Sequence, residues 1–382
     1  MSALPRVGDF LHRTWAMLVK EFIQLRRDRM TFAIMLAVPV MQLVLFGYAI
    51  DTDPRHLPTA VFSRDTSAYA RSFLAALEAT DYFDIVHRAE SNAEIDRLIL
   101  SGEVLFAVEI PADFGRDIVR GERPQLLVIA DAADPTATAG PIATLQTLAG
   151  RALARDLAGP LTARLAAPPP IEVIVHRRYN PAGDTSLNVV PGLLGVILTL
   201  TMIMFTALAV TREIERGTME ALLAMPIRPV EVMLGKIAPY ILVGAVQVAL
   251  ILIAGRLLFG VPVVGSLALL VALTMLFVVA NLSVGYTFST IAQNQLQAMQ
   301  MAVLFFLPSL LLSGFLFPFL GMPRWAQWLG EVLPLTHFVR IVRGIMLKGA
   351  TFADLSHEVL ALGLFMLAAM SVAVARFRQT LD

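Results

Sequence analysis

The side chains that carry most enzyme chemistry are few in this chain and form no catalytic pattern. The 382 residues include no cysteine, which excludes disulfides, thiol chemistry and thiolate metal sites. His56, His87 and His176 lie among many carboxylates, but their spacing matches neither a metal-ligand set nor a nucleophile motif. Asp131 and Asp134 could bind a divalent cation, yet a proline follows directly, which favours a turn and a helix cap. We therefore expect no catalytic residue and no metal site.

Lysines are the next candidates, because a lysine in a glycine-rich loop binds nucleotide phosphates. The chain has only Lys20, Lys236 and Lys348. A P-loop needs the pattern Gly-x-x-x-x-Gly-Lys-Ser/Thr. Lys236 follows a glycine but precedes Ile237, and the other two lysines have no such context. The chain therefore cannot hydrolyse ATP by that route, and energy for any work must come from a partner or an ion gradient.

The composition places these residues in a membrane protein. Hydrophobic residues make up 57% of the chain and charged residues 16%, with a mean hydropathy of +0.70. A soluble globular chain is about a quarter charged and less apolar. The net charge is zero, which argues against a nucleic-acid partner.

Long charge-free stretches give the expected topology, since a helix needs about 20 apolar residues to cross roughly 30 Å of hydrocarbon. From Leu257 to Pro323 the chain has no Asp, Glu, Lys, Arg or His, which suits two spans divided at Gln293 to Gln295. The first apolar stretch is not followed by a small-residue cleavage site, so we interpret it as a retained anchor. The predicted fold is an α-helical polytopic membrane protein with six transmembrane helices, at 30–50, 187–210, 237–256, 266–290, 296–320 and 355–376.

Basic residues near the span ends set the orientation. Arginines precede the first span and follow the sixth, and the segment 211–236 carries further basic residues. With six spans these three regions lie on one side, so both termini are expected in the cytoplasm. The segment 321–353 then faces outward as short re-entrant helices, although Arg324, Arg340, Arg343 and Lys348 run against the rule there.

The segment 51–186, between the first two spans, is long enough for an inserted extracytoplasmic domain. Strand-like and helix-like stretches alternate along it, which predicts a small α/β domain. We expect it to contact an outside partner or a second copy of the chain and not to be an enzyme. The predicted strands are 57–65, 82–90, 104–111, 124–134 and 170–181, and the predicted helices are 66–80, 91–103 and 141–166.

Two cytoplasmic elements stand out. In residues 1–29, apolar side chains such as Trp15 and Phe22 recur at helical spacing opposite basic ones, which predicts an interfacial amphipathic helix. That helix is either a simple anchor or a connector that touches a cytoplasmic partner. The segment 211–236, "TREIERGTMEALLAMPIRPVEVMLGK", is too charged for lipid and longer than a simple link needs. Short helices with an apolar ridge, stopped by Pro226 and Pro229, suit docking to a protein.

That segment resembles the characteristic loop of ABC-2-type transporter permeases, with the pattern E-x-G-T-x-E-x-L-L-x-x-P-I-x-x-x-E-x-x-x-G-K. The N-terminal "KEFIQLRRDR" resembles the connector helix of the family, and "LSGFLFPFLGMPRWAQWLGEVLPLTHFVRIVRG" resembles its segment after span five. One departure is Met225, where the family often has Thr or Ser. The large domain between the first spans resembles the subgroup linked to multidrug and lipophilic-compound efflux in Gram-negative bacteria.

The resemblance implies an ABC-2, type V exporter-like architecture in the inner membrane and a separate ABC ATPase subunit that binds ATP and Mg²⁺, with no cofactor in this chain. It also implies a second permease, identical or paralogous, and we expect a periplasmic membrane-fusion protein and an outer-membrane channel as further partners. The implied ATPase-coupling residues are Glu213, Glu215, Arg216, Gly217, Thr218, Glu220, Leu222, Leu223, Pro226, Arg228 and Glu231. The connector-helix residues are Trp15, Lys20, Glu21, Phe22, Arg26 and Arg27.

Residues of the fifth span and its exit are candidates for a substrate path or gate, because methionine and phenylalanine form adaptable apolar walls. Core packing is the alternative interpretation for the same side chains. Small residues of the fourth span, Gly285 among them, favour close helix packing over a polar pore. The candidate path residues are Met299, Met301, Phe305, Phe306, Pro308, Phe315 and Phe317.

Three functions remain distinct at this point. The first is the permease of an ABC exporter of lipophilic or amphipathic compounds. The second is an ion-driven secondary transporter, which usually has ionisable residues within its spans, and spans one to five have essentially none. The third is a non-transporting anchor that relays ATPase motion to a periplasmic partner.

Overall fold

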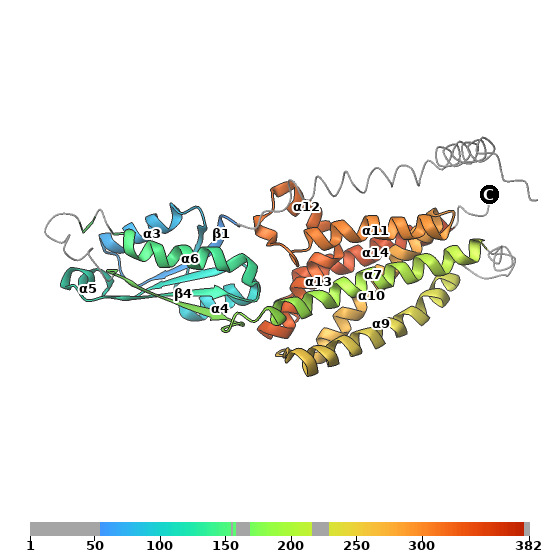
Figure 1. The fold of residues 1–382 in the computed structure, drawn as a ribbon, viewed down its shortest axis with the longest axis horizontal. Coiled ribbons are helices and arrows are strands. Elements are labelled where there is room, and N and C mark those ends of the chain that lie inside the picture. The colour runs from blue at the N-terminus through green and yellow to red at the C-terminus, as the bar shows by residue number, and fades with distance from the viewer. Residues whose placement is uncertain (1–53, 154–155, 158–168, 216–228, 378–382) are drawn as a thin grey trace, which may run out of the picture.

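The computed structural model describes residues 54–153, 156–157, 169–215 and 229–377. Within these residues an α/β unit and a bundle of long helices lie end to end along the long axis of the molecule (Figure 1). The predicted span at 30–50, the connector helix at 1–29 and the motif residues 216–228 lie outside the described residues. The end of the bundle next to the α/β unit is called the junction end. The opposite end, where α7 (Thr185–Glu215) ends and α9 (Pro229–Phe259) begins, is called the loop end.

The α/β unit contains a five-stranded mixed sheet of order β2-β1-β3-β4-β5. β3 and β4 run antiparallel, and the other neighbouring strands run parallel. Each predicted strand contains one of these strands, whose bounds are shorter because the flanking residues form turns and caps. The strands are β1 (Leu57–Ser63), β2 (Phe83–Arg88), β3 (Phe106–Ile110), β4 (Gln125–Asp131) and β5 (Glu172–Arg178).

Helices cover both faces of this sheet. α3 (Ala68–Glu78) and α6 (Pro135–Arg151) pack on one face and α4 (Asn92–Ser101) on the other. Ser91 caps α4 by accepting a hydrogen bond from the Glu94 amide at 3.3 Å, as its sequence pattern predicts. Sequence analysis did not predict α5 (Phe114–Arg120), a short helix whose Phe114 is fully buried. α6 begins six residues before the predicted start, because Asp134 caps it.

Five helices of the bundle are long and apolar enough to cross a membrane, counted over the described residues. α7 and α10 form its centre: about half of their apolar windows is buried, against 17% for α9 and 11% for α14. The first predicted span, at 30–50, is not among the described residues. The helices are α7 (Thr185–Glu215), α9 (Pro229–Phe259), α10 (Leu267–Ile291), α11 (Gln295–Leu312) and α14 (Ser356–Phe377).

Two predicted boundaries need correction. The segment 211–236 is not wholly a loop, since α7 continues to Glu215 and α9 already begins at Pro229. Proline is well suited to the first helical position, and Pro229 starts α9. The predicted helix stop at Pro226 and Pro229 concerns residues 216–228, which lie outside the described residues. The fifth span was predicted to end at residue 320, but α11 ends at Leu312 and passes through Pro308. The helix ends because Gly314 adopts a left-handed conformation with φ of +76°.

Short helices follow α11 and lie at the junction end (Figure 1). α12 carries Trp325 and Trp328 on an exposed face. The helices are the 3₁₀ turn η3 (Phe319–Gly321), α12 (Arg324–Val332), α13 (Pro334–Arg343) and the π-helical turn η4 (Gly344–Lys348).

Candidate functional site

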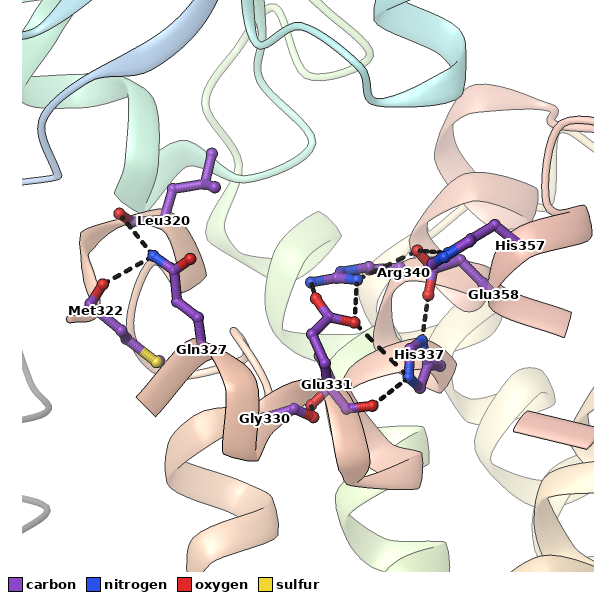
Figure 2. A network of polar contacts seen from close by, with 10 residues as sticks. Leu320, Met322, Gln327, Gly330, Glu331, His337, Arg340, His357 and Glu358 are labelled. Carbon is purple, nitrogen blue, oxygen red and sulfur yellow. Dashed lines mark hydrogen bonds and ion pairs between the residues drawn. The ribbon is translucent and has the colours of Figure 1, made fainter. Parts of the chain in front are cut away.

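Four ionisable side chains meet where α12, α13 and α14 converge, and this set, Glu331, His337, Arg340 and Glu358, is called the ionic cluster (Figure 2). Arg340 donates to Glu331 Oε1 at 2.6 Å and to Glu358 Oε1 at 3.2 Å. One ring nitrogen of His337 pairs with the Glu358 carboxylate and the other lies 2.8 Å from the Glu331 carbonyl oxygen. The cluster therefore ties three helices together through charge-assisted bonds.

Helix geometry explains why these groups meet. His337 and Arg340 are three residues apart on α13 and so share one face. Glu358 lies in the first turn of α14, where a negative charge is favoured by the helix dipole. Arg340 also lies over the ring of Phe319, 4.5 Å from its centroid.

Burial and hydrogen bonding act in opposite directions on the pKa of His337 in the ionic cluster. The His337 side chain is only 4% exposed, and burial alone lowers its pKa. The bonds to Glu358 and to the Glu331 carbonyl outweigh burial, so the pKa of His337 is raised above 6.5. In the described residues, no set of three or more His, Asp or Glu side chains is arranged to hold a metal ion.

A second polar site joins the α/β unit to the bundle, and its ion pairs Asp131–Lys348 and Asp134–Arg343 are called the junction pairs. Lys348 Nζ lies 2.5 Å from Asp131 Oδ2, and Arg343 donates to Asp134 Oδ2 at 3.2 Å. All four side chains are at most 17% exposed. Ala133, between the two aspartates, is buried in the hydrophobic core of the bundle.

Each basic residue of the junction has further partners. Arg343 bonds Asn188 in the first turn of α7 and the Gly314 carbonyl after α11, while its Nε is buried without a partner. Lys348 lies 3.4 Å from the Ile99 carbonyl and over the ring of Tyr179. Parts of the chain far apart in sequence therefore converge on α13 and η4.

Sequence analysis did not find these two sites. It interpreted Asp131 and Asp134 as a turn and a cap, and Asp134 does cap α6 by accepting from the Thr136 amide. It noted Arg340, Arg343 and Lys348 only as exceptions to the orientation rule. The available signal was that each of these three basic residues, in an apolar region, needs a buried carboxylate partner.

Among the predicted coupling residues at the loop end, the structure describes the side chain of Glu215. Glu215, the last residue of α7, accepts hydrogen bonds from the backbone and side-chain amides of Gln295 at 2.7 and 2.5 Å. These bonds lower the pKa of Glu215. The link joins the end of α7 to the first residue of α11. Glu213 and Glu231 lie on α7 and α9, but their side chains are outside the description, and the coupling residues from Arg216 to Arg228 lie outside it altogether.

The candidate path residues are divided between surface and core. Met299 is 40% exposed, whereas Phe305 packs edge-to-face on Phe288. Phe315 is buried against Gly192, where an added Cβ would lie 2.0 Å from the ring. Met301, Phe306 and Phe317 are half-buried, and Pro308 lies within α11.

Small residues bring the central helices into close contact. A Cβ added at Gly285 of α10 would lie 2.4 Å from the Ile203 carbonyl oxygen of α7. This contact supports the packing interpretation of the small residues of the fourth span. Phe277 and Phe338 stack in parallel with centroids 4.0 Å apart, which fixes α13 against α10.

Comparison with known proteins places this arrangement in a family. The family described as ABC-2 family transporter protein matches residues 29–375. The probable multidrug ABC transporter permease YbhS of Escherichia coli K12 is 30% identical over 342 residues, which cover 88% of this chain and 89% of that protein. The probable multidrug ABC transporter permease YbhR is 28% identical, with coverage of 96% and 99%, and the inner membrane transport permease YhhJ is 32% identical, with coverage of 75% and 76%. This chain belongs to the ABC-2 family of transporter proteins.

Proposed function

We propose that the chain is the permease subunit of an ABC exporter that moves lipophilic or amphipathic compounds out of the cytoplasm or the inner leaflet. The family match over residues 29–375 carries this proposal. Two relatives named probable multidrug ABC transporter permeases support the substrate class. The sequence contains no P-loop, which supports ATP hydrolysis, with its Mg²⁺, on a separate ATPase subunit.

The coupling proposal places the ATPase on the segment 211–236, with the residues named above as its contacts and the N-terminal helix as a connector. The course of α7 supports it. This helix has 31 residues and is therefore roughly 46 Å long. Asn188 near its start bonds Arg343, and Glu215 at its end bonds Gln295. Movement at the loop end thus has a continuous helix along which to reach the junction end.

The surrounding assembly is part of the same proposal. The chain would lie in the bacterial inner membrane with both termini in the cytoplasm and six spans. A second permease, identical or paralogous, would complete the path, with Met299 and its neighbours on α11 along it. The sparsely buried helices α9 and α14 leave apolar surface for lipid or for that second permease. The α/β unit would lie in the periplasm, within reach of a membrane-fusion protein and an outer-membrane channel.

The loop test uses a chain that has no native cysteine. We expect Glu220→Lys to abolish co-purification of the ATPase while the chain stays in the membrane, whereas Glu122→Lys, an exposed site on the α/β unit, retains the ATPase. A cysteine introduced at Ala221 should react with an impermeant maleimide only when the cytoplasmic side is accessible. Labelling from outside, or ATP hydrolysis by the purified chain alone, would overturn the proposal.

A further inference from the structure

The α/β unit is attached to the bundle by side-chain contacts as well as by the chain segment that connects them. Its sheet leads into α7 through residues 179–184, which gives one path for movement from the bundle. The structure adds a second attachment, because Asp131 at the end of β4 and Asp134 at the N-cap of α6 pair with Lys348 and Arg343.

The two basic residues lie on one continuous helical segment, α13 followed by η4. Arg343 ends α13 and Lys348 ends the π-helical turn that follows. That turn is also bound to the segment before α10, because the Val264 and Gly265 amides donate to the Met346 and Ile345 carbonyls at 3.0 and 2.9 Å. A Cβ on Gly265 would lie 2.8 Å from the Ile345 carbonyl oxygen, so the contact is a close backbone approach. The element is therefore positioned by the central helices of the bundle.

Charge and burial make the attachment specific. Asp131 and Lys348 are 6% and 12% exposed, so removing either partner leaves a buried charge uncompensated. The Lys348 ammonium is also held by the Ile99 carbonyl and the ring of Tyr179, which come from two other parts of the α/β unit. These directional bonds resist sliding and rotation of the α/β unit against α13 and η4 more than an apolar contact would, because each bond requires one geometry.

We propose that the junction pairs transmit the movement of the membrane helices to the α/β unit, so that α13, η4 and the α/β unit move as one body during the transport cycle. Lys348, Arg343, Asp131 and Asp134 are positioning residues in this account, which rests on the proposed function. Movement starting at the loop end reaches the periplasmic unit through two routes, α7 and α13–η4.

The first experiment measures distances between spin labels in the complex of the chain with its ATPase. One pair of labels, at Glu122 and Phe352, reports on the α/β unit against the residues after η4, and both sites are exposed. A second pair, at the exposed residues Arg212 and Arg376, reports on the loop end. We expect the loop-end distance to change between the nucleotide-free and ATP-trapped states while the Glu122–Phe352 distance stays constant. We expect Lys348→Asp to broaden the distribution of Glu122–Phe352 distances.

The outcomes separate the two claims. A loop-end change accompanied by an equal change between Glu122 and Phe352 in the wild type would overturn the one-body inference and leave the exporter proposal standing. No loop-end change with ATP would count against the exporter proposal itself. The wild-type measurement needs no junction variant, so a folding defect in Lys348→Asp does not decide the result.

The second experiment measures export and ATP hydrolysis together. We expect Lys348→Asp and Asp131→Lys each to reduce export about tenfold with ATP hydrolysis retained, and the double swap to recover most of the loss. The control swaps Asp113 and Arg116, an exposed pair of the same unit at 2.9 Å, and should leave export unchanged. A double swap as defective as the single variants, or single variants that export normally, would overturn the inference.

Discussion

At the residue scale, partners within the chain explain three of the four basic side chains that run against the orientation rule. Arg340 pairs with Glu331 and Glu358, Arg343 with Asp134, and Lys348 with Asp131. Each positive charge is therefore compensated within the chain and does not act as a topology signal. The charges instead bind the short helices of the junction end to one another and to the α/β unit.

The His337 environment gives a pH dependence with a definite sign. The pKa of His337 is raised in the folded chain, so the stability it contributes is fully present below pH 6.5 and is lost as pH rises through the folded pKa. We expect the thermal midpoint of the wild type to exceed that of His337→Gln by more at about pH 6 than at about pH 8.5.

The matched control for this measurement is His357→Gln. His357 neighbours Glu358 but is 80% exposed, so its replacement should leave the pH dependence of the wild type intact. A difference between wild type and His337→Gln that grows as pH rises would contradict the account.

At the element scale, the apolar runs predicted several helices closely because a lipid-spanning helix must be both long and apolar. The fourth span, expected at 266–290, is α10 at Leu267–Ile291. The end of α11 was misplaced because the chain stays apolar through Phe315 and Leu320 after the helix has ended at a left-handed glycine. Hydropathy responds to composition and not to backbone conformation.

The junction pairs lay beyond sequence reasoning for a different reason. Asp134 and Arg343 are 209 residues apart, and Asp131 and Lys348 are 217 apart. No periodicity or spacing relates residues at such separations, so only the packed structure pairs them. The coupling motif, by contrast, was recognisable because its residues are contiguous.

Close packing of α7 on α10 can be tested with two glycines. Gly285→Ala places a methyl group against the Ile203 backbone, so the helices must separate, at a cost of about 1–3 kcal/mol. Gly363→Ala on α14 meets nothing within 4 Å and should be neutral or stabilising by up to about 1 kcal/mol. Thermal unfolding in detergent checks both, and equal midpoints for the two variants would contradict the packing account.

At the scale of the whole molecule, the ion pairs of the described bundle lie at its junction end, and mostly apolar packing fills the length between its two ends. The link between Glu215 and Gln295 joins two long helices at the loop end, and the junction pairs join the α/β unit at the other. This arrangement suits a protein that receives movement at one end and delivers it at the other. Between the two ends, α7 and α10 pack closely, because Gly285 lies against the backbone of Ile203.

ATP-driven transport by the chain together with a separate ATPase is the central claim, and it is tested most directly in proteoliposomes. They contain the chain, its ABC ATPase, or both, with the ATPase facing outward, and uptake of a lipophilic fluorescent dye is followed after ATP is added. We predict ATP-dependent uptake only when both proteins are present, unaffected by a protonophore. Uptake by the chain alone that a protonophore abolishes would contradict the account in favour of an ion-driven transporter, and ATP hydrolysis without any dye uptake would contradict it in favour of a non-transporting anchor.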